Sequence, residues 1–202
     1  MEFWDRLDGA ADRLDVLRHP FYVRWSEGTL TPAELGLYAG QYAHAVRALA
    51  AAARSVADSP EATAHAAEEE AHIELWDGFA RAAGAGPAAP LPETSDCVEA
   101  WADPDRSKLA TLVALYTIES AQPAISEVKR AGLVDLYGYS PGQATAYFDV
   151  HTERDLEHAR AGRAAIAGLR DAGSEDDDVL VAEAERVLAA NWRLLDGVER
   201  AS

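Results

Sequence analysis

The stretch DVHTERDLEHA, residues 149–159, decides how this sequence folds and what it can bind. It has the composition of a helix, and His151, Asp155 and His158 stand in it at offsets of four and seven residues. At about 100° per residue, the three side chains lie within about 40° of one another on one helical face. Two imidazoles and a carboxylate on one stripe are a set of ligands for a transition metal. On its own, the triplet is equally compatible with a charged surface stripe.

A second ligand-like set, EEEAH, ends at His72. Glu69 and His72 form a Glu-x-x-His pair, and Glu68 lies one turn before the same histidine, so either glutamate can share a face with it. His65, seven residues before His72, is a third candidate. The alternative interpretation of this run of glutamates is a solvated acidic face.

Glu119 is the only acidic residue in the apolar stretch KLATLVALYTIESAQ. Apolar residues surround it in the helical pattern, so we expect its carboxylate to be buried, at a high cost unless a metal or an arginine compensates. Three histidines and three carboxylates on three helices would suit two iron or manganese ions. The six positions are Glu69 (or Glu68), His72, Glu119, His151, Asp155 and His158.

Helix starts are marked by a capping residue followed by proline, an arrangement that satisfies an exposed backbone N–H and loses none. We find no strand alternation and no tandem repeat, so residues 1–202 are predicted to form one all-α domain of about seven helices. Pro123 should interrupt one helix, and a short helix should continue to about 132. Four such starts are Thr31-Pro32, Ser59-Pro60, Asp103-Pro104 and Ser140-Pro141, and they predict helices over 32–57, 60–83, 104–122 and 141–171. Two further helices are expected over about 3–18 and from the acidic run SEDDD to about 198. We also expect a short helix around VEAWA and a loop over 84–94.

Composition excludes several classes of protein. The formal net charge of −17 argues against binding to nucleic acid or to anionic membranes. No apolar run reaches the roughly 18 residues of a membrane span, and the acidic, amphipathic N-terminus is unlike a signal peptide, so we expect a cytoplasmic protein. The single cysteine, Cys97, rules out an internal disulfide, and we expect it to be inert in a polar loop.

A ferritin-like di-iron bundle does not match these positions. That fold needs a glutamate from the helix over 32–57, where the only acid is Glu34, which is expected to complete a capping box with Thr31. His151 would also be surplus.

The chain resembles another helical family over nearly its whole length. HPFYVRWSEGTLTPAELGLYAGQYAHAV (residues 19–46) is similar to the opening of haem-oxygenase-like proteins, which include TenA thiaminases, PqqC oxidases and non-haem di-iron oxidases. The His-x3-Asp-x2-His motif resembles the di-iron oxidase branch. TenA enzymes use a cysteine on the mid-chain helix, which this chain lacks, and PqqC enzymes need no metal.

Within that branch the chain most resembles the chlamydial protein associating with death domains and its bacterial relatives, the self-sacrificing para-aminobenzoate synthases. The matching positions are Tyr22, Tyr38, Trp76 and Lys129. The resemblance implies a cofactor of two iron ions, or one iron and one manganese, with O2 and a reductant as co-substrates. It further implies that Tyr22 supplies an aromatic ring and Lys129 an amino group. The family's first glutamate stands seven residues before the histidine, where this chain has His65.

Three functions therefore remain open. The first is a dimetal oxidase of the para-aminobenzoate synthase type, and the second is an oxidase that uses the same ligands on an external amino acid or fatty acid. The third is a non-catalytic interaction protein of the same fold, which would bind no metal. The resemblance also implies a homodimer.

Overall fold

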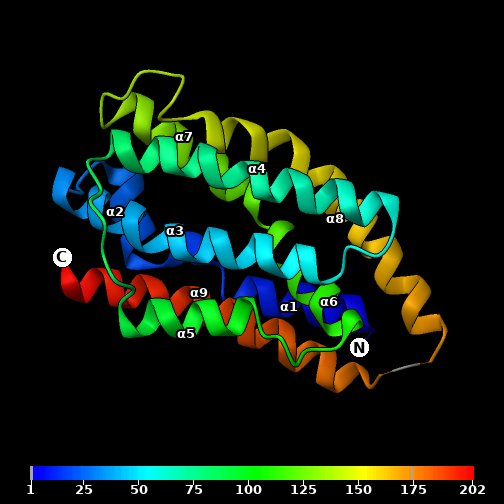
Figure 1. Ribbon diagram of the computed structural model, residues 1–202. Coiled ribbons are helices and arrows are strands. Elements are labelled where there is room, and N and C mark those ends of the chain that lie inside the picture. The colour runs from blue at the N-terminus through cyan, green and yellow to red at the C-terminus, as the bar shows by residue number, and fades with distance from the viewer. Residues whose placement is uncertain (1, 174) are drawn as a thin grey trace.

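A computed structural model describes residues 2–173 and 175–202, apart from the side chains of residues 153–156. Every regular element in these residues is helical, so the all-α prediction is confirmed, although the helices exceed the expected seven. In chain order they are α1 (Phe3–Arg13), a short 3₁₀ turn η1 (Val16–Arg18), α2 (Pro20–Glu27), α3 (Pro32–Ser55), α4 (Pro60–Ala82), α5 (Pro92–Trp101), α6 (Lys108–Glu119), α7 (Gln122–Asp135), α8 (Ala146–Asp171) and α9 (Asp177–Ala201) (Figure 1).

Two helices begin at the prolines that the sequence marked. At the start of α3, the Thr31 hydroxyl accepts from the Glu34 amide and the Glu34 carboxylate accepts from the Thr31 amide, which is the expected capping box. At the start of α4, the Ser59 hydroxyl accepts from the amide of Ala62. These caps fix where α3 and α4 start, and the apolar residues of each helix determine which face turns inward.

The other two predicted starts were wrong. Helix α6 begins at Lys108 because Ser107, and not Asp103, caps it by accepting from the Ala110 amide. Helix α8 begins only at Ala146, since the residues after Pro141 form a turn in which the Gly142 amide donates to the Thr145 hydroxyl. A capping residue before a proline therefore also occurs in turns that precede a helix.

Two segments are more helical than expected. His19-Pro20 ends η1 but also starts α2, because His19 Nδ1 accepts from the amide of Phe21 and caps the new helix. Cys97, which we expected in a polar loop, lies in α5 and is fully buried. Burial raises the pKa of its thiol, which keeps the sulfur protonated and unreactive.

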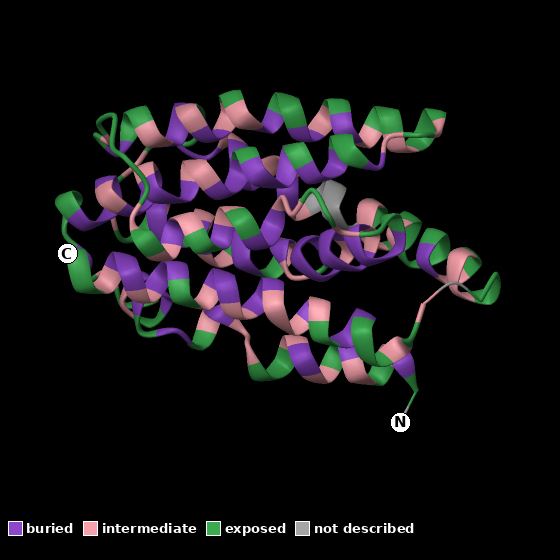
Figure 2. Ribbon diagram, turned by 60° about the horizontal axis from the view of Figure 1, so that its bottom comes forward, coloured by how far each residue is buried: buried purple, intermediate pink, exposed green. Residues whose placement is uncertain are grey.

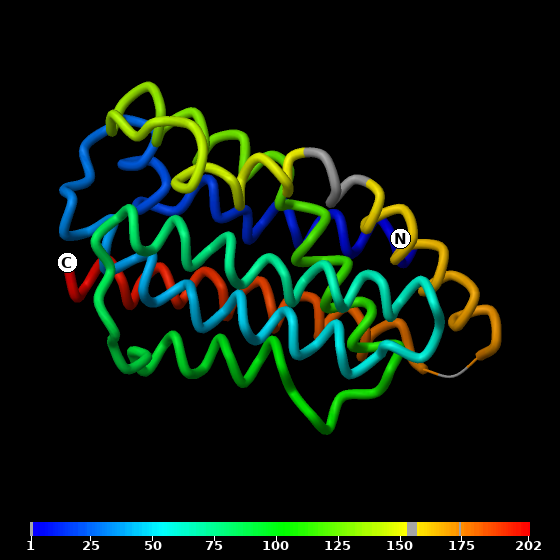
Figure 3. The backbone as a smooth tube through the Cα atoms, turned by 45° about the horizontal axis from the view of Figure 1, so that its top comes forward, coloured from blue at the N-terminus to red at the C-terminus, as the bar shows by residue number. Residues whose placement is uncertain are grey.

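The helices pack in layers with apolar faces inward. Helix α3 lies against α4, α5 lies against α9, and α8 packs against α6 and α7 (Figure 3). Buried residues form stripes on the inner faces and exposed residues cover the outside (Figure 2). The two chain ends lie at opposite ends of the bundle (Figure 1).

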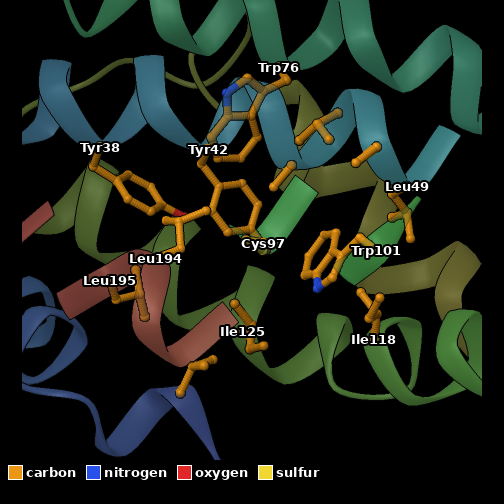
Figure 4. Packing of buried hydrophobic residues seen from close by; sticks show 14 of the residues in the cluster. Tyr38, Tyr42, Leu49, Trp76, Cys97, Trp101, Ile118, Ile125, Leu194 and Leu195 are labelled. Atoms are coloured by element: carbon orange, nitrogen blue, oxygen red, sulfur yellow. The ribbon is translucent and has the colours of Figure 1, made fainter. Parts of the chain in front are cut away.

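Aromatic side chains dominate the larger of two cores. Figure 4 shows Tyr38, Tyr42 and Trp76 side by side in this core, with Trp101 beyond them. A smaller core joins α1, α6, α8 and α9. None of the helices in the described part of the chain is long and apolar enough to cross a membrane.

Candidate metal centre

Helix α4 presents three potential ligands on one face. His65, Glu69 and His72 are four and three residues apart, so their side chains point to the same side of the helix. That side faces α6, which carries Glu119, and α8, which carries His151 and His158. Residues that are 93 positions apart in the sequence thus converge between three helices.

One group of donor atoms is deeply buried. Glu69, His72 and His151 each offer one ligand atom, and these atoms lie within 4.8 Å of one another. His72 Nδ1 is 3.1 Å from Glu69 Oε1, and the rings of His72 and His151 are 4.4 Å apart between centroids. All three residues are at most 4% exposed. We call this group the inner position.

A second group lies beside it, nearer the surface. His65, Glu69 and His158 also place ligand atoms within 4.8 Å of one another. His65 Nε2 is 3.1 Å from Glu119 Oε1, and His158 Nε2 is 3.2 Å from Glu68 Oε2. We call His65, Glu69, His158 and Glu119 the outer position. Glu69 belongs to both positions, as a carboxylate that bridges two ions would.

Three of these donor atoms are poorly satisfied by the protein itself. His65 Nε2, His72 Nδ1 and Glu119 Oε1 are buried and make no hydrogen bond, although each approaches another potential ligand. Buried polar atoms normally find a partner, so atoms left without one mark a place where something else binds. The mixture of imidazole and carboxylate fits iron or manganese.

The two buried glutamates are in opposite electrostatic situations. Burial raises the pKa of Glu119 above its usual range, against the opposing influence of His65. Burial would also raise the pKa of Glu69, but its contact with His72 and the nearby imidazoles outweigh this and lower it. A divalent cation would stabilise both carboxylates in the charged form.

The structure therefore brings most of the predicted ligands together. Glu69, His72, Glu119, His151 and His158 all converge, and Glu119 is buried as expected. The side chain of Asp155 lies outside the described residues. Glu68 contacts His158 at the edge of the outer position, whereas Glu69 is buried and belongs to both groups of donor atoms. His65, in the place of the family's glutamate, is part of the cluster too.

A second cluster, formed by Tyr22, Tyr38 and Lys129, lies further inside. The Tyr22 and Tyr38 hydroxyls are 2.7 Å apart, and burial raises the pKa of both well above the usual range. Lys129 is fully buried, with Nζ 5.0 Å from the centre of the Tyr22 ring and 5.4 Å from that of Tyr38. Desolvation lowers the pKa of its amine to about 7.

The backbone of Lys129 is held by α2. The Trp25 indole N–H donates to the Lys129 carbonyl at 3.2 Å. One turn later, a Cβ on Gly132 would stand 2.5 Å from Trp25 Nε1, so only glycine permits this approach. The hydrogen bond and the glycine place the C-terminal half of α7 directly against α2, the helix that carries Tyr22.

Aromatic rings connect the two clusters. His151 stacks on Tyr147 with 3.9 Å between ring centroids, and Tyr147 meets Trp76 at 4.8 Å. Trp76 in turn lies 5.9 Å from Tyr38. Two aromatic residues of this connection were not predicted from the sequence. Tyr147 stands one helical turn before His151. Tyr42 stands one turn after Tyr38, and the centre of the Tyr42 ring is 4.8 Å from Lys129 Nζ.

Comparison with known proteins agrees with this arrangement. The chain belongs to a family of iron-containing redox enzymes, whose family model matches residues 42–192. Its fold is haem oxygenase-like: a domain of unknown function from Shewanella denitrificans with that fold has a TM-score of 0.79 at 20% identity, covering 100% of this chain and 93% of the other. A TenA homologue from P. horikoshii has a TM-score of 0.75 at 17% identity, with 100% of both chains covered.

More similar sequences carry a specific name. A 4-aminobenzoate synthase of Chlamydia muridarum is 35% identical over 92% of this chain and 85% of its own length. One of Nitrosomonas europaea is 32% identical over 97% of this chain and 90% of its own, and one of Chlamydia trachomatis is 33% identical over 97% and 91%. The resemblance to the haem-oxygenase-like oxidases and this branch is thus confirmed.

Proposed function

We propose that this chain is a dimetal, O2-activating oxidase of the 4-aminobenzoate synthase type, which consumes its own Tyr22 as the source of the ring and Lys129 as the donor of the amino group. The observation that carries the proposal is the enclosure of Lys129 with Tyr22 and Tyr38 in a cluster where each residue is at most 1% exposed. A lysine is rarely buried unless its amine is paired or used.

The ligands would divide between two ions. The inner position would hold one ion, and the outer position the other, with Glu69 shared. Bound there, two irons or one iron and one manganese would supply O2 activation, with a reductant as the electron source.

The state of Lys129 suits an amino donor. Because burial lowers the pKa of its amine to about 7, a large share of the side chain is neutral at physiological pH. A neutral amine has the free electron pair needed to form a bond to carbon, which an exposed lysine lacks at this pH.

The state of Tyr22 suits a ring donor. Its hydroxyl is fixed by that of Tyr38, and its ring lies beside Lys129 Nζ. The rings of Tyr147, Trp76 and Tyr38 lie between Tyr22 and His151, and such side chains can pass an oxidising equivalent without opening the core to water.

Intact-protein mass tests the proposal directly. After loading with iron and manganese and reaction with O2 and a reductant, the mass should fall by the loss of the Tyr22 side chain together with the amino nitrogen of Lys129. Tyr22→Phe should show no such loss. Lys129→Met should make no 4-aminobenzoate, whereas Lys108→Met, which changes an exposed lysine paired with Asp58, should behave as the unaltered protein. An active protein of unchanged mass would contradict the proposal.

A cavity beside the ligands favours a second candidate, an oxidase of an external amino acid or fatty acid. It has a volume of about 380 Å³ and is lined by His65, Glu119 and His158. Turnover of an added substrate with the protein mass unchanged would support this function.

The non-catalytic alternative predicts negligible metal after expression with iron and manganese, and elemental analysis measures this.

A further inference from the structure

The cavity beside the outer position opens between α4, α6 and α8. Its volume is about 380 Å³, and its lining includes three members of the outer position, His65, Glu119 and His158. A water molecule takes up about 30 Å³ in the liquid, so a divalent cation with six waters, roughly 200 Å³, fits inside. The cavity is therefore large enough to hold a hydrated metal ion.

The charge of the lining suits a cation. Three glutamates line the cavity, Glu61, Glu68 and Glu157, and of these Glu61 and Glu157 are exposed. No lysine or arginine is among the described residues that line it. Deeper in, Glu119 is 3% exposed, and its Oε1 makes no hydrogen bond. Such a lining concentrates cations and raises their association rate.

The two metal positions differ in their access to this cavity. His65 and His158 of the outer position line it, whereas His72 and His151 of the inner position do not. Beyond the inner position, His151 stacks on buried Tyr147, which packs against buried Trp76. In the described part of the structure, the inner position thus has the outer position on one side and the aromatic core on the other.

We infer that the cavity is the inlet for divalent metal ions and that an ion in the inner position is trapped behind one in the outer position. The inference rests on the proposed dimetal function and adds the order in which the two ions enter and leave. Ions reach the inner position only through the outer one, and they leave in the reverse order. The outer ion exchanges with solvent, and the inner ion exchanges only after the outer one has gone.

Chelator extraction tests the order. Protein loaded with Mn²⁺ is mixed with excess chelator, and released Mn²⁺ is followed by its EPR signal. Two phases of equal amplitude are expected. When excess Zn²⁺, which gives no EPR signal, replaces the chelator and keeps the outer position filled, only half of the bound Mn²⁺ should be released. Release of both ions in one phase, or release of all the Mn²⁺ in the presence of excess Zn²⁺, would overturn the order.

A matched pair of glycine variants on α8 tests the inlet. A Cβ on Gly162 would meet Tyr116 at 3.7 Å, an ordinary contact, so Gly162→Leu should fold while its side chain narrows the cavity. Gly168 lies on the same helix with open space around it, so Gly168→Leu is the control. Gly162→Leu should take up Mn²⁺ severalfold more slowly to the same final content. Equal uptake rates in the two variants would overturn the inlet.

A second pair of variants tests the charge. Glu61→Gln with Glu157→Gln should lower the Mn²⁺ uptake rate about three- to tenfold at low salt, and less at high salt. Glu74→Gln, on the exposed side of α4, should have no effect. An equal fall of the Mn²⁺ uptake rate in Glu74→Gln would contradict the attraction of cations by the acidic lining of the cavity.

These experiments also separate the inference from the proposed function. If the unaltered protein binds no metal, the proposed function fails as well. If it binds two ions per chain but exchanges them in no fixed order, only the order and the inlet are refuted.

Discussion

The metal centre and the Lys129 cluster are two buried polar sites built on opposite principles. The metal centre gathers acids and imidazoles from α4, α6 and α8, and a cavity connects it to solvent. The Lys129 cluster places one amine among aromatic rings and is sealed. The first site gathers groups that a bound cation would stabilise in their charged form, whereas burial in the second lowers the pKa of the Lys129 amine to about 7. Under the proposed function, the metal centre would take up its ions and O2 from solvent, whereas the Lys129 cluster would hold the ring and the amine that are consumed.

The largest effect is expected at Glu69, because both metal positions share it. Glu69→Ala should abolish metal binding at both positions, and elemental analysis of the purified protein would show this. Glu70→Ala, which alters the neighbouring exposed residue paired with Arg54, should keep its full metal content. A Glu69→Ala protein that retains both ions would contradict the assignment of Glu69 as a ligand shared by the two metal positions.

The next largest effect is expected in how the unfolding free energy depends on pH, because Lys129 is buried. Its pKa is about 7 when folded and near 10.5 when unfolded, so the unfolded chain binds more protons between these values. The unfolding free energy should therefore rise with pH across this window, by about 1.4 kcal/mol per unit and about 4–5 kcal/mol in all, relative to Lys129→Met. Below pH 7 both states are protonated and the difference becomes constant.

Denaturant unfolding of both proteins, with chelator present to remove metal linkage, would measure this difference. Lys108→Met, which changes a lysine exposed on the surface, is the matched control. A pH-independent difference for Lys129→Met would mean that Lys129 keeps its proton in the core.

A smaller effect is expected from the tyrosine pair. Removing one hydroxyl from the 2.7 Å contact leaves the other buried without its partner, so Tyr22→Phe and Tyr38→Phe should each cost about 1–2 kcal/mol of stability. The double variant should cost less than the sum, and this difference is the coupling energy. Additive losses would show that the two hydroxyls do not interact in solution.

The two sites also differ in how far the sequence could predict them. The ligands of α4 and α8 follow helical spacing, so pattern alone placed them on single faces. Glu119 stood out as the only acid of an apolar helix. The role of His65 was left open, because a histidine where relatives have a glutamate conflicts with a simple match. Its contact with Glu119 joins two helices, and no local pattern encodes it.

The Lys129 cluster depended on resemblance. Nothing in the spacing of Tyr22, Tyr38 and Lys129 indicates that α2, α3 and α7 meet, and a lone lysine in a polar stretch is most simply a surface residue. Tyr147 and Tyr42 escaped notice because aromatic residues on inner faces usually serve packing alone. The start of α8 was misplaced for a related reason: Ser140-Pro141 has the local chemistry of a cap, and the turn that follows is set by Thr145 and Gly142.

Isotope labelling tests most directly whether the chain is its own substrate. Protein grown with lysine labelled with heavy nitrogen and tyrosine labelled with heavy carbon in the ring would be loaded with metal and allowed to react once. We predict 4-aminobenzoate that carries both labels, and a protein altered at Tyr22 and Lys129. Unlabelled product, or a labelled ring with unlabelled nitrogen, would contradict the role assigned to these two residues.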